Sequence, residues 1–139
     1  MANDFKIEIN LKECQNAIND AMVQALEEAS GELETQTKRN TKVDTGKTKG
    51  SWEHRVDKEN GIAYVGSNYE NAIWEEFGTG VHALNGNGRK TPWVYTPDEG
   101  KTFYTTTGKK PRRALHKAFE SSKNKIEKYF RETFGDIKW

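Results

Sequence analysis

Hydrophobic residues recur every three or four positions in two long stretches of the chain, which is the period of a helix with one buried face. The first stretch predicts a helix over about residues 11–39, in which Gly31 is the only weak interior position. The second predicts a helix that starts near Pro111, a favourable first-turn residue, and ends at Gly135. The first stripe consists of Leu11, Cys14, Ile18, Ala21, Met22, Ala25, Leu26, Ala29 and Leu33, and the second of Leu115, Ala118, Phe119, Ser122, Ile126, Tyr129, Phe130 and Phe134.

Shorter stretches alternate hydrophobic and polar residues, which is the period of strands. Ser51–Asp57 and Ile62–Ser67 predict one hairpin, because the Asn60-Gly61 pair between them tolerates the positive φ of a tight turn. Trp93–Thr96 and Thr102–Thr107 predict a second hairpin, joined by a turn that contains Pro and Gly.

Two further segments are assigned by weaker signals. The hydrophobic residues of segment 4–10 alternate with charged ones and predict a half-buried strand; the alternatives are that the segment extends the following helix or frays. Asp44 or Thr45 is suited to cap a single helical turn that begins at Gly46.

The segment Asn68–Phe77 predicts a short helix with both ends marked. Asn68 is suited to cap its N-terminus, and Gly78 is suited to end it. A buried face follows from the three- and four-residue spacing of its apolar residues. That face consists of Tyr69, Ala72, Ile73 and Phe77.

Glu75 and Glu76 fall in the last turn of this helix, where the helix dipole disfavours negative charge. Either water solvates both carboxylates, or a basic group from elsewhere in the chain, or from another chain, meets them. Residues 79–92 then predict a long loop. Its part 81–90 has little to bury, so we expect it to be mobile in the free subunit and to become ordered on assembly.

These elements predict a single α+β domain over residues 1–139. Its expected architecture is an antiparallel sheet of about four strands, made of two hairpins, packed by two long amphipathic helices. One short helix and the long loop complete it.

Composition narrows the functional classes. Only 33% of the residues are hydrophobic and 31% are charged, so the core must depend on aromatic side chains. A single Cys excludes an intrachain disulfide and a cysteine zinc site, and no segment approaches the ~20 apolar residues of a membrane span. We therefore expect a protein that is made and used in a reducing, cytoplasmic setting, without a membrane.

No set of residues predicts catalysis, a cofactor or a metal site. His54, His82 and His116 are expected in a strand, a loop and a helix, without the spacing of metal ligands. The triplet Gly46-Lys47-Thr48 resembles the end of a phosphate-binding loop, but Thr41 stands where that motif needs a glycine. Nucleotide binding is therefore rejected.

Charge is unevenly distributed although the net charge is only +1. Residues 1–34 carry two basic and eight acidic side chains, whereas residues 81–113 carry seven basic and two acidic ones. Such blocks either pair within one molecule or let the acidic surface of one copy meet the basic surface of another.

Three short motifs occur in order along the chain. The first consists of Val43, Asp44, Thr45, Gly46 and Ser51, the second of Tyr64–Asn68, and the third of Glu76, Phe77, Gly78, Thr79 and Gly80; a Pro then precedes Ala114, Leu115, Ala118 and Phe119. In order and spacing, these motifs resemble the head–tail joining, or tail-completion, family of long-tailed bacteriophages and prophages. The resemblance covers roughly residues 41–120, and the first helix fits it by position. Where the family often has an aromatic-leucine pair after a proline, this chain has Arg112-Arg113-Ala114-Leu115.

The resemblance implies a virion structural protein without catalysis or cofactor. Such proteins lie at the head–tail junction, commonly as a homo-oligomeric ring, and contact the connector or head-completion proteins and the tail. The implied localisation is the virion, and the host cytoplasm during assembly. We expect the free chain to be a monomer that assembles on its template or at high concentration. The residues expected to contact a neighbour are Glu75, Glu76, Arg89, Lys90, Trp93, Lys109, Lys110, Arg112 and Arg113.

The alternative function is a small nucleic-acid-binding module. Segment 89–113 interleaves basic and aromatic residues, which together can hold phosphates and stack on bases. A hairpin with a solvated basic face explains the same pattern, and the low net charge favours that interpretation. We therefore expect at most weak, non-specific contact with DNA. Nothing in the sequence supports a small enzyme.

Overall fold

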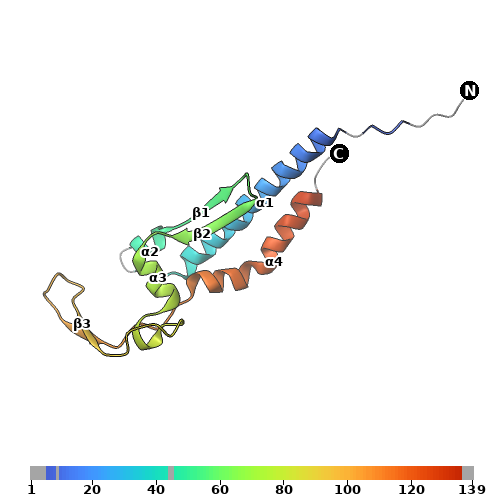
Figure 1. The fold of residues 1–139 in the computed structure, drawn as a ribbon. Coiled ribbons are helices and arrows are strands. Elements are labelled where there is room, and N and C mark those ends of the chain that lie inside the picture. Colours follow the sequence, from blue (N-terminus) through green and yellow to red (C-terminus); the bar gives the residue numbers. More distant parts are fainter. Residues whose placement is uncertain (1–5, 9, 44–45, 136–139) are drawn as a thin grey trace, which may run out of the picture.

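The computed structural model describes residues 6–8, 10–43 and 46–135 (Figure 1). The chain is α+β and contains two antiparallel hairpins, as the sequence predicts. Its elements are α1 (Leu11–Asn40), α2 (Lys47–Gly50), β1 (Trp52–Asp57), β2 (Ile62–Ser67), α3 (Glu70–Phe77), the 3-10 helix η1 (Gly80–His82), β3 (Trp93–Tyr95), β4 (Tyr104–Thr106) and α4 (Ala114–Gly135).

Helix α1 lies at the centre of the subunit. The β1–β2 hairpin packs on one side of α1, and α4 packs along another (Figure 1). The predicted sheet of about four strands is instead two separate two-stranded sheets, β1–β2 and β3–β4. The reason is that β3 and β4 are only three residues long and stand beyond α3, away from the first hairpin (Figure 1).

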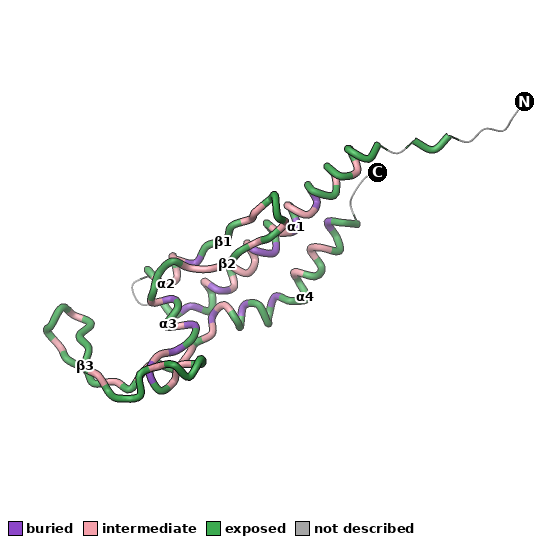
Figure 2. The backbone as a smooth tube through the Cα atoms, in the orientation of Figure 1, coloured by how far each residue is buried: buried purple, intermediate pink, exposed green. Residues whose placement is uncertain are grey.

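Small side chains form the interior between α1 and α4, and we call this contact the alanine seam. It contains Ala21, Ala25 and Ala29 of α1 and Ala114 and Ala118 of α4 (Figure 2). Small residues let the two helix backbones approach closely, in the way that well-packed interiors require. Among the described residues, no Leu, Ile, Val, Phe, Met or Tyr is fully buried.

Among the described residues, Trp52 of β1 is the one large hydrophobic side chain that is buried, with 4% of its surface exposed. Its indole N–H donates to the hydroxyl of Thr41 at 3.0 Å, and that hydroxyl donates to the carbonyl oxygen of Thr37 at 2.7 Å. The bonds satisfy each buried polar group and fasten the start of β1 to the end of α1.

His54 makes a second connection between β1 and α1. Its Nδ1 lies 3.1 Å from a carboxylate oxygen of Glu34, and its Nε2 lies 3.1 Å from one of Glu27. Burial lowers the pKa of His54, but the hydrogen bonds with Glu34 and Glu27 outweigh it, so the pKa lies above its usual value of 6.5. The protonated ring donates to both carboxylates.

The first hairpin follows the prediction closely. Trp52 pairs with Ser67 and Asp57 with Ile62, and Gly61 has the positive φ, 64°, that its turn needs. The carboxylate of Asp57 accepts the N–H groups of Glu59 and Asn60 and closes the turn.

The N-terminal segment departs from the prediction. Segment 6–8 is in no strand and Ile7 is 85% exposed, so the predicted strand over 4–10 is wrong for these residues; positions 4, 5 and 9 lie outside the described residues. Within the described ranges residues 6–8 pair with no strand, and Asn10 caps α1 by accepting the N–H of Glu13 at 3.1 Å.

Two helices begin later than predicted. Helix α3 starts at Glu70, and the hydroxyl of Ser67 rather than Asn68 accepts the N–H of Tyr69. Helix α4 starts at Ala114 and not at Pro111, because Arg113 has a left-handed φ of 60° that the helix excludes.

The predicted buried face of α3 is only partly buried. Ala72 is fully covered, whereas Tyr69, Ile73 and Phe77 keep 37–50% of their surface exposed. The other elements of the subunit do not close over this face. At the C-terminus, Gly78 ends the helix as predicted, with φ 75°.

Candidate assembly site

The two carboxylates at the end of α3 meet basic groups of the same chain. Glu76 is 5% exposed, and its carboxylate accepts the backbone N–H groups of Leu115 at 2.9 Å and His116 at 3.1 Å. These are unpaired donors of the first turn of α4, and the positive end of the α4 dipole favours a negative charge there. Glu76 therefore caps α4 from another helix.

Glu75 holds the segment that leads into α4. The ammonium of Lys109 bonds to its carboxylate, and Nε of Arg112 lies 3.0 Å from its other oxygen, close enough for an ion pair. The backbone N–H of Arg112 also donates to the carbonyl oxygen of Glu75 at 2.6 Å. The guanidinium of Arg113 lies 4.0 Å from the carboxylate of Glu76. We call this arrangement the α3–α4 junction.

The junction changes how the predicted contact residues are used. Lys109, Arg112 and Arg113 are paired within the chain, while 29–46% of each side chain stays exposed, so their contact with a neighbour stays a prediction. In the described part of the chain, Lys90 and Lys110 have no carboxylate partner. Of the seven cations in segment 89–113, Arg89, Lys90, Lys101 and Lys110 make no such ion pair within the described ranges.

Glycines bring two backbone segments together beside the junction. The N–H of Thr79 donates to the carbonyl oxygen of Lys109 at 2.9 Å, and the N–H of Val81 donates to the carbonyl oxygen of Thr107 at 3.0 Å. Gly80 has φ 60°, and a Cβ there would collide with the carbonyl oxygen of Thr107. Gly108 faces the carbonyl oxygen of Thr79 with the same restriction. The motif Gly78-Thr79-Gly80 therefore needs its glycines for close backbone approach.

The predicted loop over 79–92 begins with a defined path. Residues 80–82 form η1, and the N–H of Leu84 donates to the carbonyl oxygen of Phe77 at 2.9 Å. Gly88 lies against the backbone of Gly80. Contacts within the chain thus hold the start of the loop, and the mobility of 81–90 stays a prediction.

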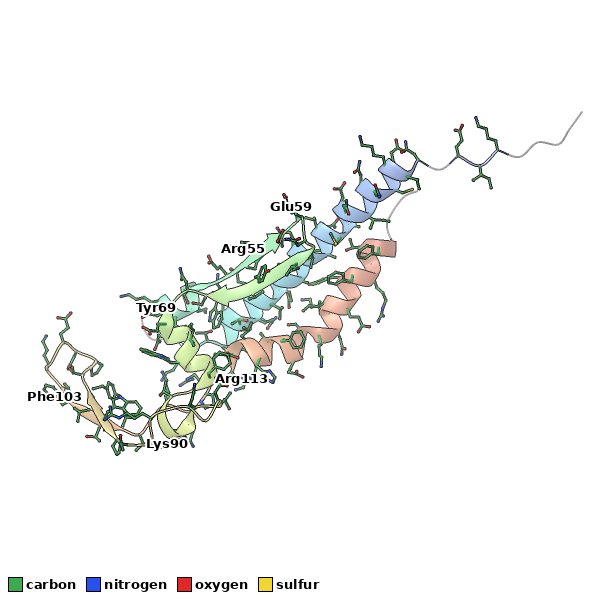
Figure 3. The ribbon with its side chains drawn as sticks, in the orientation of Figure 1. Arg55, Glu59, Tyr69, Lys90, Phe103 and Arg113 are labelled. Carbon is green, nitrogen blue, oxygen red and sulfur yellow. The ribbon has the colours of Figure 1, made fainter. Side chains whose placement is uncertain are left out.

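Residues 91–107 form a hairpin that we call the arm, which projects beyond α3 (Figure 1). The rings of Tyr95 and Tyr104 pack with centroids 5.7 Å apart. Val94 and Phe103 are 60% and 67% exposed, and Figure 3 shows Phe103 far from the helices. At the tip, the carboxylate of Asp98 accepts the N–H of Thr102 at 2.6 Å, which shapes the turn.

Arg89 and Trp93 lie at the base of the arm. The guanidinium of Arg89 lies 5.7 Å from the ring centroid of Trp93, in a cation–π arrangement. Trp93 also borders a hollow of about 610 Å³ between the arm and α3, together with Trp74 and Tyr95.

A larger apolar groove of about 730 Å³ lies among α1, β2, α3 and α4. Leu26 and Leu33 of α1, Val65 of β2 and Phe77 and Phe119 line it. Phe77 and Phe119 are 43% and 46% exposed. Periodicity in the sequence placed Leu26, Leu33, Phe77 and Phe119 on apolar helix faces and did not single out Val65. It also does not show whether the elements close over these faces.

The first motif of the resemblance lies near the second one in space. The hydroxyl of Ser51 donates to Thr48 at 2.6 Å and accepts from Ser67 at 2.7 Å, which joins α2 to β2. The side chain of Asn71 in α3 donates to the hydroxyl of Thr48 at 2.9 Å.

Two other residues of the first motif lie within the described ranges. Gly46 precedes α2 with φ 83°, and Val43 is 60% exposed. Asp44 and Thr45, the residues predicted to cap this helical turn, lie outside the described residues.

Within the described ranges, no group of three or more His, Cys, Asp or Glu side chains is arranged to hold a metal ion. No helix in the same ranges is long and apolar enough to cross a membrane. Comparison with protein-family models, curated proteins and solved structures finds no match to this chain.

Proposed function

We propose that this chain is a non-enzymatic virion structural protein of a long-tailed phage or prophage, which assembles as a ring at the head–tail junction. The observation that carries the proposal is the incomplete interior of the subunit. Within the described ranges, the buried hydrophobic residues are six alanines and one tryptophan, while larger apolar side chains line an open groove or project on the arm. A chain of this kind gains its missing apolar contacts from neighbours.

The motif residues give the proposal a second support. Glu76, Gly78, Thr79 and Gly80 hold the α3–α4 junction and fix the base of the arm. The motif that resembles the head–tail joining family therefore positions the most prominent projection of the subunit. Its proposed partners are further copies of itself, the capsid connector or head-completion proteins and the tail, with at most weak contact to passing DNA.

Disruption of the gene in the phage or lysogen that encodes this chain tests the proposal. Electron microscopy of the induced lysate should show filled capsids and separate tails, and a plasmid copy of the wild-type gene should restore joined particles. Mass spectrometry of purified particles should detect the chain. Joined, infectious particles in the absence of the chain would refute the proposed function.

A further inference from the structure

The free edge of β2 forms one wall of the apolar groove. Strand β2 pairs only with β1, and in the described ranges no backbone hydrogen bond joins it to any other strand. In an antiparallel pair, alternate residues of a strand direct both N–H and C=O away from the partner. Half of the backbone groups of β2 are therefore available to another strand, beside the groove-lining residues Ala63 and Val65.

The two edges of this sheet differ in chemistry. Strand β1 carries Glu53, His54, Arg55 and Asp57, whereas β2, Ile62–Ser67, carries no charge and no proline. Natural proteins usually protect a free edge with charges, proline or a covering segment. Charged side chains guard the β1 edge, and β2 has none of these devices, which is expected of an edge that receives a strand.

The arm lacks an extensive packing surface in its own subunit. It is a two-stranded hairpin, which is marginally stable without a packing surface. Strands β3 and β4 pack against each other and make no extensive contact with α1, α4, β1 or β2. Backbone bonds at Thr79 and Val81 hold the base of the arm beside α3, and the arm runs away from α1, β2 and α4 of its own subunit (Figure 1).

The sizes of the two surfaces agree. Val94, Tyr95, Phe103 and Tyr104 are 46–67% exposed. At ~150–250 Å² for a fully buried aromatic side chain, they offer about 400 Å² of apolar surface. With a similar area from the groove, one contact that used both faces of the hairpin would bury at most about 800 Å², which is below the usual range of specific interfaces. A single contact is then weak, and a closed ring, in which each subunit makes two, is stable.

We propose that the arm of one copy docks in the groove of a second copy and adds a strand to the free edge of β2. The proposal depends on the self-association that the proposed function also requires, and it identifies the two surfaces involved. Because the arm and the groove are different surfaces, the contact is heterologous and closes into a ring at a suitable rotation.

Two variants separate the donor surface from the acceptor surface. An acceptor chain with Phe103→Ser and Tyr104→Ser loses the apolar arm and keeps the groove. A donor chain with Phe119→Lys, at a half-exposed position of the groove, keeps the arm and fills the groove. Because Phe119 is half-exposed, the isolated donor should fold. The second donor variant is Ile73→Lys, at another half-exposed position of the groove.

Isotope-labelled acceptor is titrated with unlabelled full-length donor, and amide shifts are followed by NMR. Saturable shifts of the acceptor amides at Ala63, Val65 and Phe119 are expected. A titrant that carries both the arm and the groove substitutions should bind the acceptor at least tenfold more weakly than the donor does. A donor with Lys90→Glu and Lys110→Glu is the charge control and should bind within about threefold of the parent. In sedimentation, the donor–acceptor mixture should stop at dimers, whereas wild type should form larger species.

Absence of shifts at the groove, or equal shifts with the titrant that lacks the arm, would overturn the docking model. Shifts that depend on Lys90 and Lys110 rather than on the aromatic residues would replace it with a contact made by charge. If virions require the chain but the purified chain shows no arm-to-groove binding, the proposed function stands without this interface. If the arm docks in the groove but virions form without the chain, the interface stands and the proposed function is refuted.

Discussion

Glu76 offers the sharpest test of how the subunit holds together. Replacing it by Gln keeps the shape of the side chain, but removes the charge and leaves one oxygen for the N–H groups of Leu115 and His116. A hydrogen bond to a charged group contributes ~1.5–3 kcal/mol, and a charge at a helix end contributes ~0.3–2 kcal/mol. Glu76→Gln should therefore lower the free energy of unfolding by about 3 kcal/mol, and Tm by roughly 6–12 °C for a chain of this length.

Denaturation with urea, followed by tryptophan fluorescence, measures this loss. Hydrogen exchange should show faster exchange of the amides at the start of α4. The matched control is Glu120→Gln, since Glu120 is a half-exposed residue whose Oε2 lies 3.9 Å from Nζ of Lys123. The control should change stability by less than ~0.5 kcal/mol, as exposed ion pairs do. A Glu76→Gln variant that is as stable as this control would refute the conclusion that the Glu76 carboxylate caps α4.

Four further predictions follow from separate features. Because the pKa of His54 is raised, its stabilising contribution is complete below pH 6.5 and is lost as the pH rises through that raised pKa. His54→Gln should remove most of the fall in stability between pH 6 and pH 8 seen in wild-type urea titrations. Gly80→Ala should cost at least ~2 kcal/mol by thermal unfolding, whereas Gly86→Ala, with φ 71° but open space, should cost about 1 kcal/mol. DNA binding, measured by fluorescence anisotropy, should be weak and fall steeply between low and physiological salt; sequence-selective binding at physiological salt would favour the nucleic-acid alternative. Limited proteolysis of the monomer should cut first within residues 81–90, and protection there would contradict the expected mobility.

Local pattern was sufficient for most elements of this fold, although it wrongly predicted a strand at residues 6–8. The helical period placed α1 to within one residue at its end, and Asn60-Gly61 located the first hairpin. These features depend on neighbours in sequence, where periodicity and turn chemistry operate. The start of α4 was wrong because a left-handed Arg113 is set by tertiary contacts and not by its own preference.

Contacts distant in sequence could not be predicted. The sequence raised the question of what meets Glu75 and Glu76, and the answer lies about 35–40 positions away, in Lys109 and the first turn of α4. Charge counts identified the acidic and basic segments of the chain. They could not show whether these segments pair within one chain or between copies. The sequence also could not predict that the sheet divides into two hairpins or that the groove stays open, because both depend on the distances between packed elements.

The alanine seam also decides when the subunit can fold during its synthesis. Helix α1 leaves the ribosome first, yet its partner α4 follows roughly a hundred residues later, an interval of about 5–20 s at ~5–20 residues per second. Until then, Ala21, Ala25 and Ala29 face water, and the buried surface between α1 and α4 does not exist. A chain that is cut short before α4 has no closed interior and is an easy substrate for proteases. Only chains that extend through α4 close the seam, because its two halves lie far apart in the sequence.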